Sequence, residues 1–358
     1  MIFRLNTLIV LIEKTMNSMQ CKDIFSGKVI MIIGGTGSFG HKFTEIVLQR
    51  YKPRKLIIFS RDEVKQYEMA QEFNTLEMRY FIGDVRDCER LTMAMRGVNY
   101  VLHAAALKQV STAEYNPMEC VKTNVYGAEN VVKAALANNV EKVIAMSTDK
   151  AANPINLYGA TKLCSDKIFT AANNIAGGNN ARFSVVRYGN VVASRGSVVP
   201  YFKKLMNNGS AYLPITHEQM TRFWITLQQG VEFVCKSFEL MLGGELFVPK
   251  IPSVRIVDLA RAMAPDLPHK IIGIRPGEKI HEVMCPKDDS HLTVEFKNHF
   301  VITPSIKFYN RGSGFFKNVL GEEGNKVPQG FEYNSGNNPY FLSIPEIIKY
   351  NHFAGILD

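Results

Sequence analysis

Short apolar runs alternate with helix-period segments along most of this chain, from Gly27 onward. Each run holds about four to six hydrophobic residues, as strands buried on both faces do. Strand–helix alternation at this spacing predicts an α/β protein with a doubly wound parallel sheet and helices on both faces. The expected strands are "KVIMIIG", "KLIIFS", "MRYFIGD", "YVLHAAA", "KVIAMST" and "FSVVRYG", and the expected helices are "HKFTEIVLQRY", "CERLTMAMRG", "AENVVKAALANNV" and "TKLCSDKIFTAANN".

The pattern becomes less regular after about Asn190, where loop residues dominate 191–222 and 250–315. The segment "WITLQQGVEFVCKSFELM" predicts a helix that returns to the first domain. We therefore expect a Rossmann domain over 24–189, joined by a returning segment near 223–249. A smaller, discontinuous substrate domain and a C-terminal segment occupy most of 190–358.

The N-terminal residues 1–23 predict a poorly ordered extension. Their apolar stretch is about eight residues long, far below the roughly 20 that span a bilayer. Glu13 and Lys14 follow it directly, and no small-residue cleavage site appears. We expect no membrane span, and Met16 or Met19 would be equally good starts, so whether 1–23 belongs to the mature protein stays open.

The net charge of +9, from 42 basic and 33 acidic residues, suits an anionic partner. Because the basic residues are scattered singly, we expect a small anionic ligand and not nucleic acid. Six widely spaced cysteines without a CxxC pair indicate reduced thiols in a cytoplasmic protein. The histidines have no metal-binding spacing, so no metal is expected.

The stretch "VIMIIGGTGSFG" is an apolar run that leads into a glycine-rich turn before a helix. Such a turn lets the backbone approach a pyrophosphate, whose charge then lies at the helix N-terminus. The position directly after the first core strand makes this a dinucleotide-binding loop. The expected cofactor contacts here are Gly34, Thr36, Gly37, Ser38, Phe39 and Gly40.

The end of the second strand bears on which dinucleotide binds. Ser60 and Arg61 suit a 2′-phosphate, because arginine makes bidentate, charge-assisted bonds to it. They favour NADP, whereas the following Asp62 keeps NAD open. We also expect Asp84 and Val85 to meet the adenine. Three small residues leave room for the cofactor or serve tight helix–sheet packing: Ala104, Ala105 and Ala106.

Tyr158 and Lys162 are four residues apart and share one face of an expected helix. A nearby ammonium and a positive nicotinamide ring would both favour the phenolate, whose ordinary pKa is near 10. Tyr158 would then be a base that deprotonates a sugar hydroxyl while hydride leaves the same carbon. The YxxxK pattern is common by chance, but behind a dinucleotide loop it is a strong signal.

From Gly27 to about Tyr350 the chain resembles the extended short-chain dehydrogenase/reductases that act on nucleotide sugars. Within that family it looks most like the configuration-inverting UDP-N-acetylglucosamine 4,6-dehydratases, which begin pseudaminic acid synthesis. Asp149 and Lys150 follow Thr148 where retaining dehydratases place an Asp–Glu pair, and Thr148 lies only ten residues before Tyr158. The motifs that carry the resemblance are "GGTGSFG", "GDVRD", "HAAALKQV", "KTNVYGAENV", "STDKA", "YGATK", "RYGNVVASRGSVVP", "MTRFWIT", "RPGEKIHE" and "YNSGNN".

The resemblance implies oxidation at sugar carbon 4, loss of water from carbon 6 and inversion at carbon 5. Asp149 would protonate the leaving hydroxyl, and Lys150 would handle the carbon 5 proton. Lys150 can be a base if burial and neighbouring cations depress its pKa. Thr148 would hold the carbon 4 oxygen. Without the resemblance, Asp149 and Lys150 could equally be a solvated pair at a strand end.

The resemblance also implies a UDP-N-acetylglucosamine substrate, tightly bound NADP that is regenerated each turnover, and a homo-oligomer. A guanidinium suits the UDP diphosphate, although each arginine considered alone could be an exposed charge. Lys108 is either a sugar contact or a solvated lysine. The expected substrate contacts are Lys108, Asn190, Arg195, Arg222, Arg275 and Glu278.

Three rival functions stay open. A dehydratase that also epimerises carbon 3 is the nearest, and Tyr158 is modest evidence against it. A UDP-sugar 4-epimerase is disfavoured by Asp149 and Lys150. A cofactor-sensing scaffold would not need Thr148, Asp149, Tyr158 and Lys162 together.

Overall fold

The computed structural model describes residues 23–177, 181–192, 197–306 and 314–353. The expected extension, residues 1–23, lies outside these ranges except for its last residue. Within them, every helix is too short or too polar to cross a membrane. No group of three or more His, Cys, Asp or Glu residues there could hold a metal ion.

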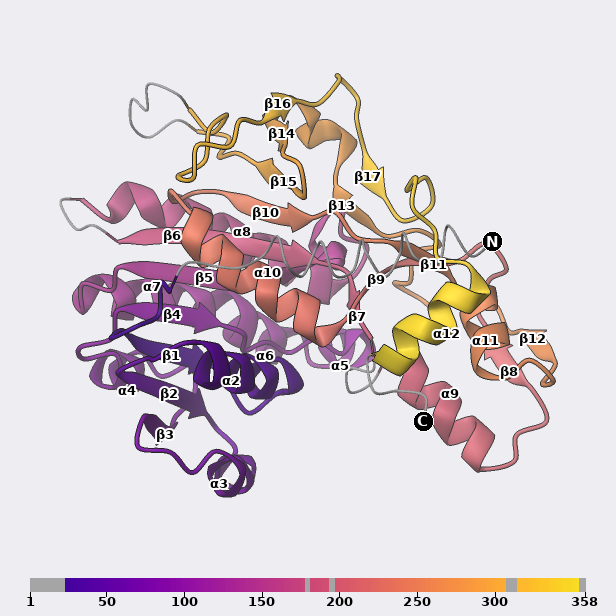
Figure 1. Cartoon of the computed structure of the whole chain (residues 1–358), viewed down its shortest axis with the longest axis horizontal. Helices are drawn as coiled ribbons and strands as arrows, with labels where there is room; N and C mark the ends of the chain where they lie inside the picture. Colours follow the sequence, from indigo (N-terminus) through magenta and orange to yellow (C-terminus); the bar gives the residue numbers. More distant parts are fainter. Residues whose placement is uncertain (1–22, 178–180, 193–196, 307–313, 354–358) are drawn as a thin grey trace.

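A central sheet of ten strands dominates the described part of the chain (Figure 1). Its order is β16-β14-β15-β10-β6-β5-β4-β1-β2-β3, and the strands from β10 to β3 are parallel. The bounds of the parallel strands are β1 Val29–Ile33, β2 Lys55–Ser60, β3 Met78–Ile82, β4 Tyr100–His103, β5 Lys142–Thr148, β6 Arg182–Tyr188 and β10 Leu246–Pro249.

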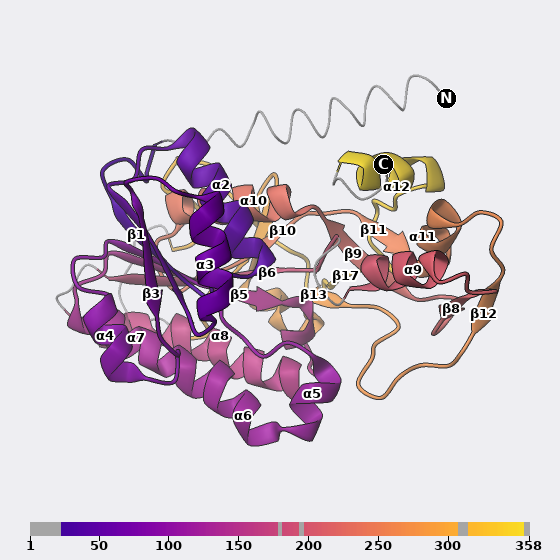
Figure 2. The same cartoon turned by 90° about the horizontal axis from the view of Figure 1, so that it is seen from below.

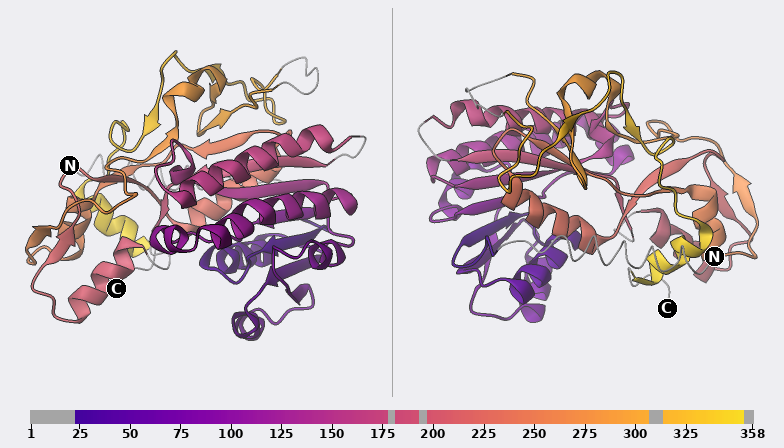
Figure 3. Two further views of the ribbon diagram at one scale, coloured as in Figure 1. Left: turned by 180° about the vertical axis from the view of Figure 1, so that it is seen from behind. Right: turned by 45° about the horizontal axis from the view of Figure 1, so that its top comes forward.

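Helices cover both faces of this sheet, as the alternating pattern predicts (Figure 2). One face carries α2 Ser38–Arg50, α3 Glu63–Glu72 and α10 Leu227–Leu240; the other carries α4 Cys88–Ala94, α7 Gly127–Ala137 and α8 Leu157–Ile175. Figure 3, left, shows α7 and α8 side by side in magenta. The doubly wound α/β fold is confirmed. The short helices between β4 and α7 are α5 Val110–Tyr115, α6 Pro117–Val121 and the π-helix η1 Lys122–Tyr126.

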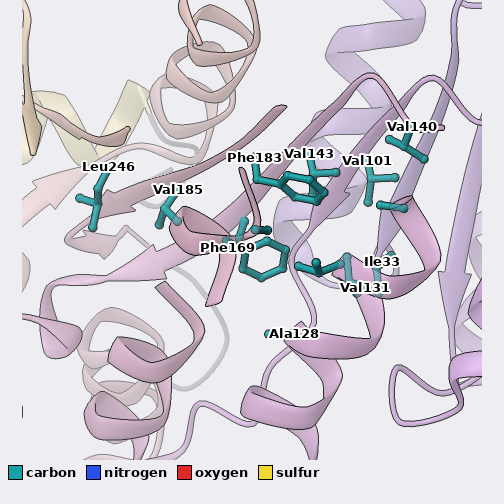
Figure 4. Close-up of a cluster of buried hydrophobic side chains, with 14 of the residues drawn as sticks. Ile33, Val101, Ala128, Val131, Val140, Val143, Phe169, Phe183, Val185 and Leu246 are labelled. Carbon is teal, nitrogen blue, oxygen red and sulfur yellow. The ribbon is translucent and has the colours of Figure 1, made fainter. Parts of the chain in front are cut away.

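The core lies in two layers, one on each face of the sheet. Figure 4 shows the layer beneath α7 and α8, where Phe169 of α8 points at Val143 and Phe183 of the sheet. Phe169 and Phe183 are both fully buried. Truncation of such a side chain to alanine typically costs about 3–5 kcal/mol. This packing holds the strand ends that carry the polar motifs.

The chain returns to the central sheet more often than the sequence indicates. The returning helix α10 packs on α2. Strand β10 then pairs with β6, and three antiparallel strands extend the sheet beyond it. The division into domains at residues 189 and 190 therefore stays a prediction. These added strands are β14 Thr293–Glu295, β15 His299–Ile302 and β16 Asn325–Lys326, and η3 Lys287–Leu292 is a short 3₁₀ helix before them.

A second, smaller body packs at the carboxyl side of the parallel strands (Figure 1, right). Its own core includes Trp224, Phe202 and Leu259. The pairs and triplets of strands there are β7–β9–β11, β8–β12 and β13–β17. Their bounds are β7 Asn190–Val191, β8 Leu213–Ile215, β9 Thr221–Ile225, β11 Ser253–Arg255, β12 His269–Ile271, β13 Val283–Cys285 and β17 Tyr333–Asn334, with α9 Val198–Asn207, α11 Ile256–Met263 and α12 Ile344–Phe353.

Candidate active site

A cleft of about 1820 Å³ lies between the carboxyl ends of the parallel strands and the second body. Ligands of doubly wound sheets bind at this edge, where the strand order reverses between β1 and β4. The cleft brings together most of the residues that the sequence singles out. The predicted site residues that line it are Gly34, Thr36, Gly37, Ser38, Phe39, Ser60, Arg61, Val85, Ala104, Ala105, Ala106, Lys108, Thr148, Asp149, Lys150, Tyr158, Lys162, Asn190, Arg222, Arg275 and Glu278.

Three predicted site residues are not among those lining residues. Gly40 lies inside α2, where a Cβ would come 2.0 Å from the Gly35 carbonyl oxygen, so the missing side chain lets α2 pack closely on the glycine-rich turn. The Asp84 carboxylate accepts bonds from the Arg86 guanidinium at 2.7 and 3.0 Å and pairs with Arg61 at 3.4 Å. The expectation that Asp84 meets the adenine stays a prediction. Arg195 lies outside the described residues.

At the corner after β2, one side chain caps a helix and its neighbours line the cleft. The Asp62 carboxylate caps α3 by accepting the Lys65 backbone N–H at 3.0 Å, and it also pairs with the Lys65 ammonium. The hydrogen bonds from Lys65 lower the pKa of Asp62. Ser60, Arg61 and Lys65 line the cleft alongside it. Lys65 is a cation that the sequence analysis did not consider.

The stretch that carries the catalytic candidates is held by local contacts. Thr148 ends β5, and Asp149 to Ala151 form the short 3₁₀ helix η2. The Asn156 side chain caps α8 by accepting the Gly159 N–H at 2.8 Å. A Cβ at Gly159 would lie 2.1 Å from the Lys150 carbonyl oxygen. The first turn of α8 can therefore approach η2 only because residue 159 is glycine, and this brings Tyr158 close to Thr148 and Asp149.

The phenol of Tyr158 has a higher pKa than the sequence analysis expects. Burial raises the pKa of Tyr158 to about 12, while Lys150 and a bond with Thr148 act to lower it. Lys162 is buried on the same face of α8, and burial lowers its own pKa. The side chains that lower the pKa of Tyr158 are Lys150 and Thr148, and Lys162 is not among them. The expectation that an ammonium and the nicotinamide ring together bring Tyr158 toward working pH stays a prediction.

Lys150 lies between two carboxylates. Its Nζ is 3.1 Å from Asp149 Oδ1 and 3.1 Å from Glu282 Oε1. Burial lowers the pKa of Lys150, but Asp149 and Glu282 outweigh burial and raise it above its ordinary value. Burial and the Arg222 cation act to depress the pKa of Lys150, as a lysine base requires, but the two carboxylates outweigh them and favour the ammonium form.

The surroundings of Asp149, in contrast to those of Lys150, favour the uncharged form. Its side chain is 1% exposed, and Oδ1 accepts the Thr148 hydroxyl at 2.9 Å. Burial, together with the nearby Glu282 carboxylate, raises the pKa of Asp149 against the opposing effect of Lys150. A carboxyl group of this kind holds its proton more strongly than an exposed aspartate and can act as a general acid.

Glu282 is the site residue that the sequence analysis missed. It is 2% exposed and lines the cleft directly before β13. It ends the motif "RPGEKIHE", of which only Arg275 and Glu278 were assigned a role. No local pattern indicates which of the two glutamates faces Lys150, because the contact joins segments far apart in the chain. Glu278 instead lies 3.5 Å from the Arg222 guanidinium.

Comparisons with known proteins agree with this fold and cleft. A family model described as "Polysaccharide biosynthesis protein" matches residues 30–304. A "UDP-N-acetylglucosamine 4,6-dehydratase (inverting)" from Campylobacter jejuni subsp. jejuni serotype O:2 is 62% identical over 333 residues, 93% of this chain and 100% of that relative. A "UDP-glucose 4-epimerase" from Rickettsia prowazekii is 44% identical over 325 residues, 88% of this chain and 92% of its own.

A solved structure supports the same assignment. The X-ray structure of Pen from Bacillus thuringiensis has a TM-score of 0.83 and 34% identity, covering 93% of this chain and 100% of its own. The expected resemblance to extended short-chain dehydrogenase/reductases is thereby confirmed. This chain belongs to the polysaccharide biosynthesis protein family, within the extended short-chain dehydrogenase/reductases.

Proposed function

We propose that this protein is a UDP-N-acetylglucosamine 4,6-dehydratase that inverts carbon 5. The observation that carries the proposal is the buried Asp149 carboxyl beside the Lys150 ammonium, on the turn that faces Tyr158. The 62% identity to the Campylobacter enzyme of that name, over its whole length, supports it. The product would be UDP-2-acetamido-2,6-dideoxy-β-L-arabino-hex-4-ulose.

The first step is oxidation at carbon 4, in which Tyr158 takes the hydroxyl proton. The Thr148 hydroxyl lies beside Tyr158 and Asp149, where it can hold the carbon 4 oxygen. Lys150 lowers the pKa of Tyr158 against burial and so favours the phenolate that this step needs. A nicotinamide cofactor held by the glycine-rich turn would supply the hydride acceptor for carbon 4 and the hydride donor for carbon 6.

Dehydration then uses the acid and the ammonium. The ketone acidifies the carbon 5 proton. Asp149 gives its proton to the carbon 6 hydroxyl, which leaves as water, and the Asp149 carboxylate formed in this way accepts the proton from carbon 5. Lys150 supplies the proton that returns to carbon 5, a role that fits its raised pKa. Return to the opposite face inverts that carbon. The proton that Tyr158 took from the carbon 4 hydroxyl balances the one that Lys150 gave to carbon 5.

The cofactor is a nicotinamide dinucleotide, and we propose NADP in preference to NAD. Arg61 and Lys65 are two cations in the cleft at the corner after β2, where a 2′-phosphate would lie. The Asp62 carboxylate, which would otherwise favour NAD, is engaged as a helix cap. Arg222 and Arg275 also line the cleft and suit the UDP diphosphate.

The remaining substrate contacts and the cell biology follow from the same proposal. Lys108 and Asn190 line the cleft between the two ends, and Asn190 Oδ1 is buried without a hydrogen-bond partner among the described residues. Glu278, beside Arg222, would take the ribose hydroxyls. We also propose that the protein works in the cytoplasm as a homo-oligomer.

The decisive experiment is NMR of the product formed from UDP-N-acetylglucosamine in heavy water. We expect a 4-keto-6-deoxy sugar with deuterium at carbon 5, the L-arabino configuration and no net consumption of NADPH. Inversion at carbon 3 as well would identify the branch that also epimerises that carbon. The Rickettsia relative named as a 4-epimerase makes the epimerase the main rival. A product that is only the galacto epimer would refute the dehydratase.

A further inference from the structure

Glu282 is a buried acid that the reaction described above does not use. Two segments of the C-terminal half hold it in place. Strand β13 pairs with β17, and Ser335 accepts the Glu282 backbone N–H through its hydroxyl at 2.9 Å. The Ser335 N–H in turn donates to the Glu282 carbonyl at 2.8 Å. The motifs "RPGEKIHE" and "YNSGNN", in which only Arg275 and Glu278 have an assigned role, thus meet to place this carboxylate.

The loop before Glu282 is also tied to the catalytic turn. The Lys279 ammonium donates to the Ala152 carbonyl at 2.6 Å, just after η2. Hydrogen bonds therefore fix the backbone segments that carry Asp149 and Glu282, the two carboxylate partners of Lys150. The remaining oxygens, Asp149 Oδ2 and Glu282 Oε2, are buried and have no hydrogen-bond partner among the described residues.

The Lys150 ammonium therefore pairs with both carboxylates at 3.1 Å each, but Asp149 and Glu282 have different electrostatic surroundings. The Arg222 Nε lies 3.8 Å from Glu282 Oε1. Burial raises the pKa of Glu282, but Lys150 and Arg222 outweigh burial and lower it. Among the described residues, Asp149 forms an ion pair with Lys150 alone, and its pKa is raised. Two acids whose environments separate their proton affinities are the usual arrangement of an acid and an ionised partner.

The other charged and titratable groups around Asp149 and Glu282 preserve the difference between the pKa values of these two carboxyl groups. Lys279, on the loop before β13, faces both carboxylates. Lys108, after β4, faces Lys150, and Tyr158 of α8 faces Lys150 and Asp149. Among these neighbours, the ionisable group that raises the pKa of Asp149 is Glu282.

We propose that Glu282 is a positioning residue for dehydration: it takes the charge of Lys150, so that the proton stays on Asp149 for the leaving hydroxyl. In the step itself the Asp149 O–H bond and the carbon 6 C–O bond break, and water forms. Asp149 is left ionised until it accepts the proton released from carbon 5. Glu282 never touches the sugar and acts through Lys150. This inference rests on the dehydratase function proposed above.

The test compares Glu282→Gln with the wild-type enzyme and with Glu282→Asp. Glutamine keeps the shape but removes the charge, so Asp149 becomes the sole carboxylate partner of Lys150 and its pKa falls. Asp149 acts only when protonated, so activity is lost as pH rises through that pKa. The basic limb of the pH–rate profile for dehydration should shift to lower pH by about one unit or more. At a given pH on that limb, this shift corresponds to about a tenfold loss of rate. Glu282→Asp keeps the charge and should return the limb toward the wild-type position.

Two further readouts separate this role from a structural one. Bound reduced cofactor, followed by its absorbance in a single turnover, reports carbon 4 oxidation, and calorimetry with UDP reports substrate binding. Both should stay within about threefold of the wild type in Glu282→Gln. The ratio of dehydration to oxidation does not depend on the folded fraction, so it is valid even for a poorly stable variant. Asp288→Asn, at an exposed carboxylate beyond β13, is the matched control and should match the wild type.

An unshifted basic limb in Glu282→Gln, with an unchanged ratio of dehydration to oxidation, would overturn the inference. Equal losses of oxidation, UDP binding and dehydration would also overturn it, because they would indicate a structural role only. Failure of the proposed function has a different signature. Wild-type enzyme that epimerises carbon 4 without losing water would remove the dehydratase assignment itself, before any Glu282 variant is compared.

Discussion

Gly159→Ala tests whether close packing of α8 on the catalytic turn is required for activity. In most helix interiors the change from glycine to alanine stabilises a protein by about 1 kcal/mol. Here a Cβ would lie 2.1 Å from the Lys150 carbonyl oxygen, whereas real Cβ contacts are essentially never under 3.0 Å. The turn or the helix must therefore move by about 1 Å, and a misplacement of that size in an active site costs about 100-fold in rate.

We expect Gly159→Ala to lower kcat about 100-fold and to lose stability by about 1–3 kcal/mol from overpacking. The matched control is Gly230→Ala in α10, where the nearest atom to a new Cβ is 3.7 Å away. That variant should keep its activity and gain up to about 1 kcal/mol. Product formation by NMR and urea denaturation measure the two effects. Gly159→Ala with wild-type kcat would refute the argument that this contact sets the catalytic geometry.

Three other variants test separate parts of the site. Lys150→Ala should slow deuterium incorporation at carbon 5 by about 10²–10⁴-fold with near-normal cofactor binding, and undiminished incorporation measured by NMR would contradict its assigned role. Arg61→Ala should reduce the preference for NADP over NAD by about 10–100-fold, as expected for a lost charge-assisted bond, and equal dissociation constants before and after the change would exclude a 2′-phosphate contact. Asp166→Ala leaves Arg187, which is 3% exposed and pairs with it at 3.0 Å, as an unpaired buried charge. It should cost about 3–5 kcal/mol in urea denaturation, and a loss below about 1 kcal/mol would mean that the Arg187 charge finds another partner.

The sequence predicts the central sheet well because its strands are long apolar runs with helices of clear period between them. The six expected strands all occur, from β1 to β6, and the four expected helices correspond to α2, α4, α7 and α8. Helix α3 was not predicted because it buries little, chiefly Gln66 and Met69. Strands β14 and β16 were also missed, because segments of two or three residues have no measurable period.

For the candidate site, too, the sequence predicts what a local motif determines and misses what depends on distant segments. Residues named by a local motif, such as Tyr158 and Thr148, do line the cleft. Asp62 has the residue type of an NAD contact, but its use as a helix cap depends on the Lys65 backbone. The roles of these residues stay predictions. Proton affinities could not be predicted at all, because they depend on burial and on charges brought by other segments.

Lys150 illustrates why the distant contact matters for mechanism. Considered with Asp149 alone, a lysine in a buried cleft could lose its proton, because burial penalises the charged form. A second carboxylate from the segment before β13 reverses that balance and raises the pKa of Lys150. The same carboxylate raises the pKa of its neighbour Asp149. One side chain from the C-terminal half therefore raises the proton affinity of both Asp149 and Lys150. A motif search restricted to the stretch around Tyr158 can identify the two groups but not which of them holds a proton, so the chemistry of this site depends on how the second body packs against the sheet.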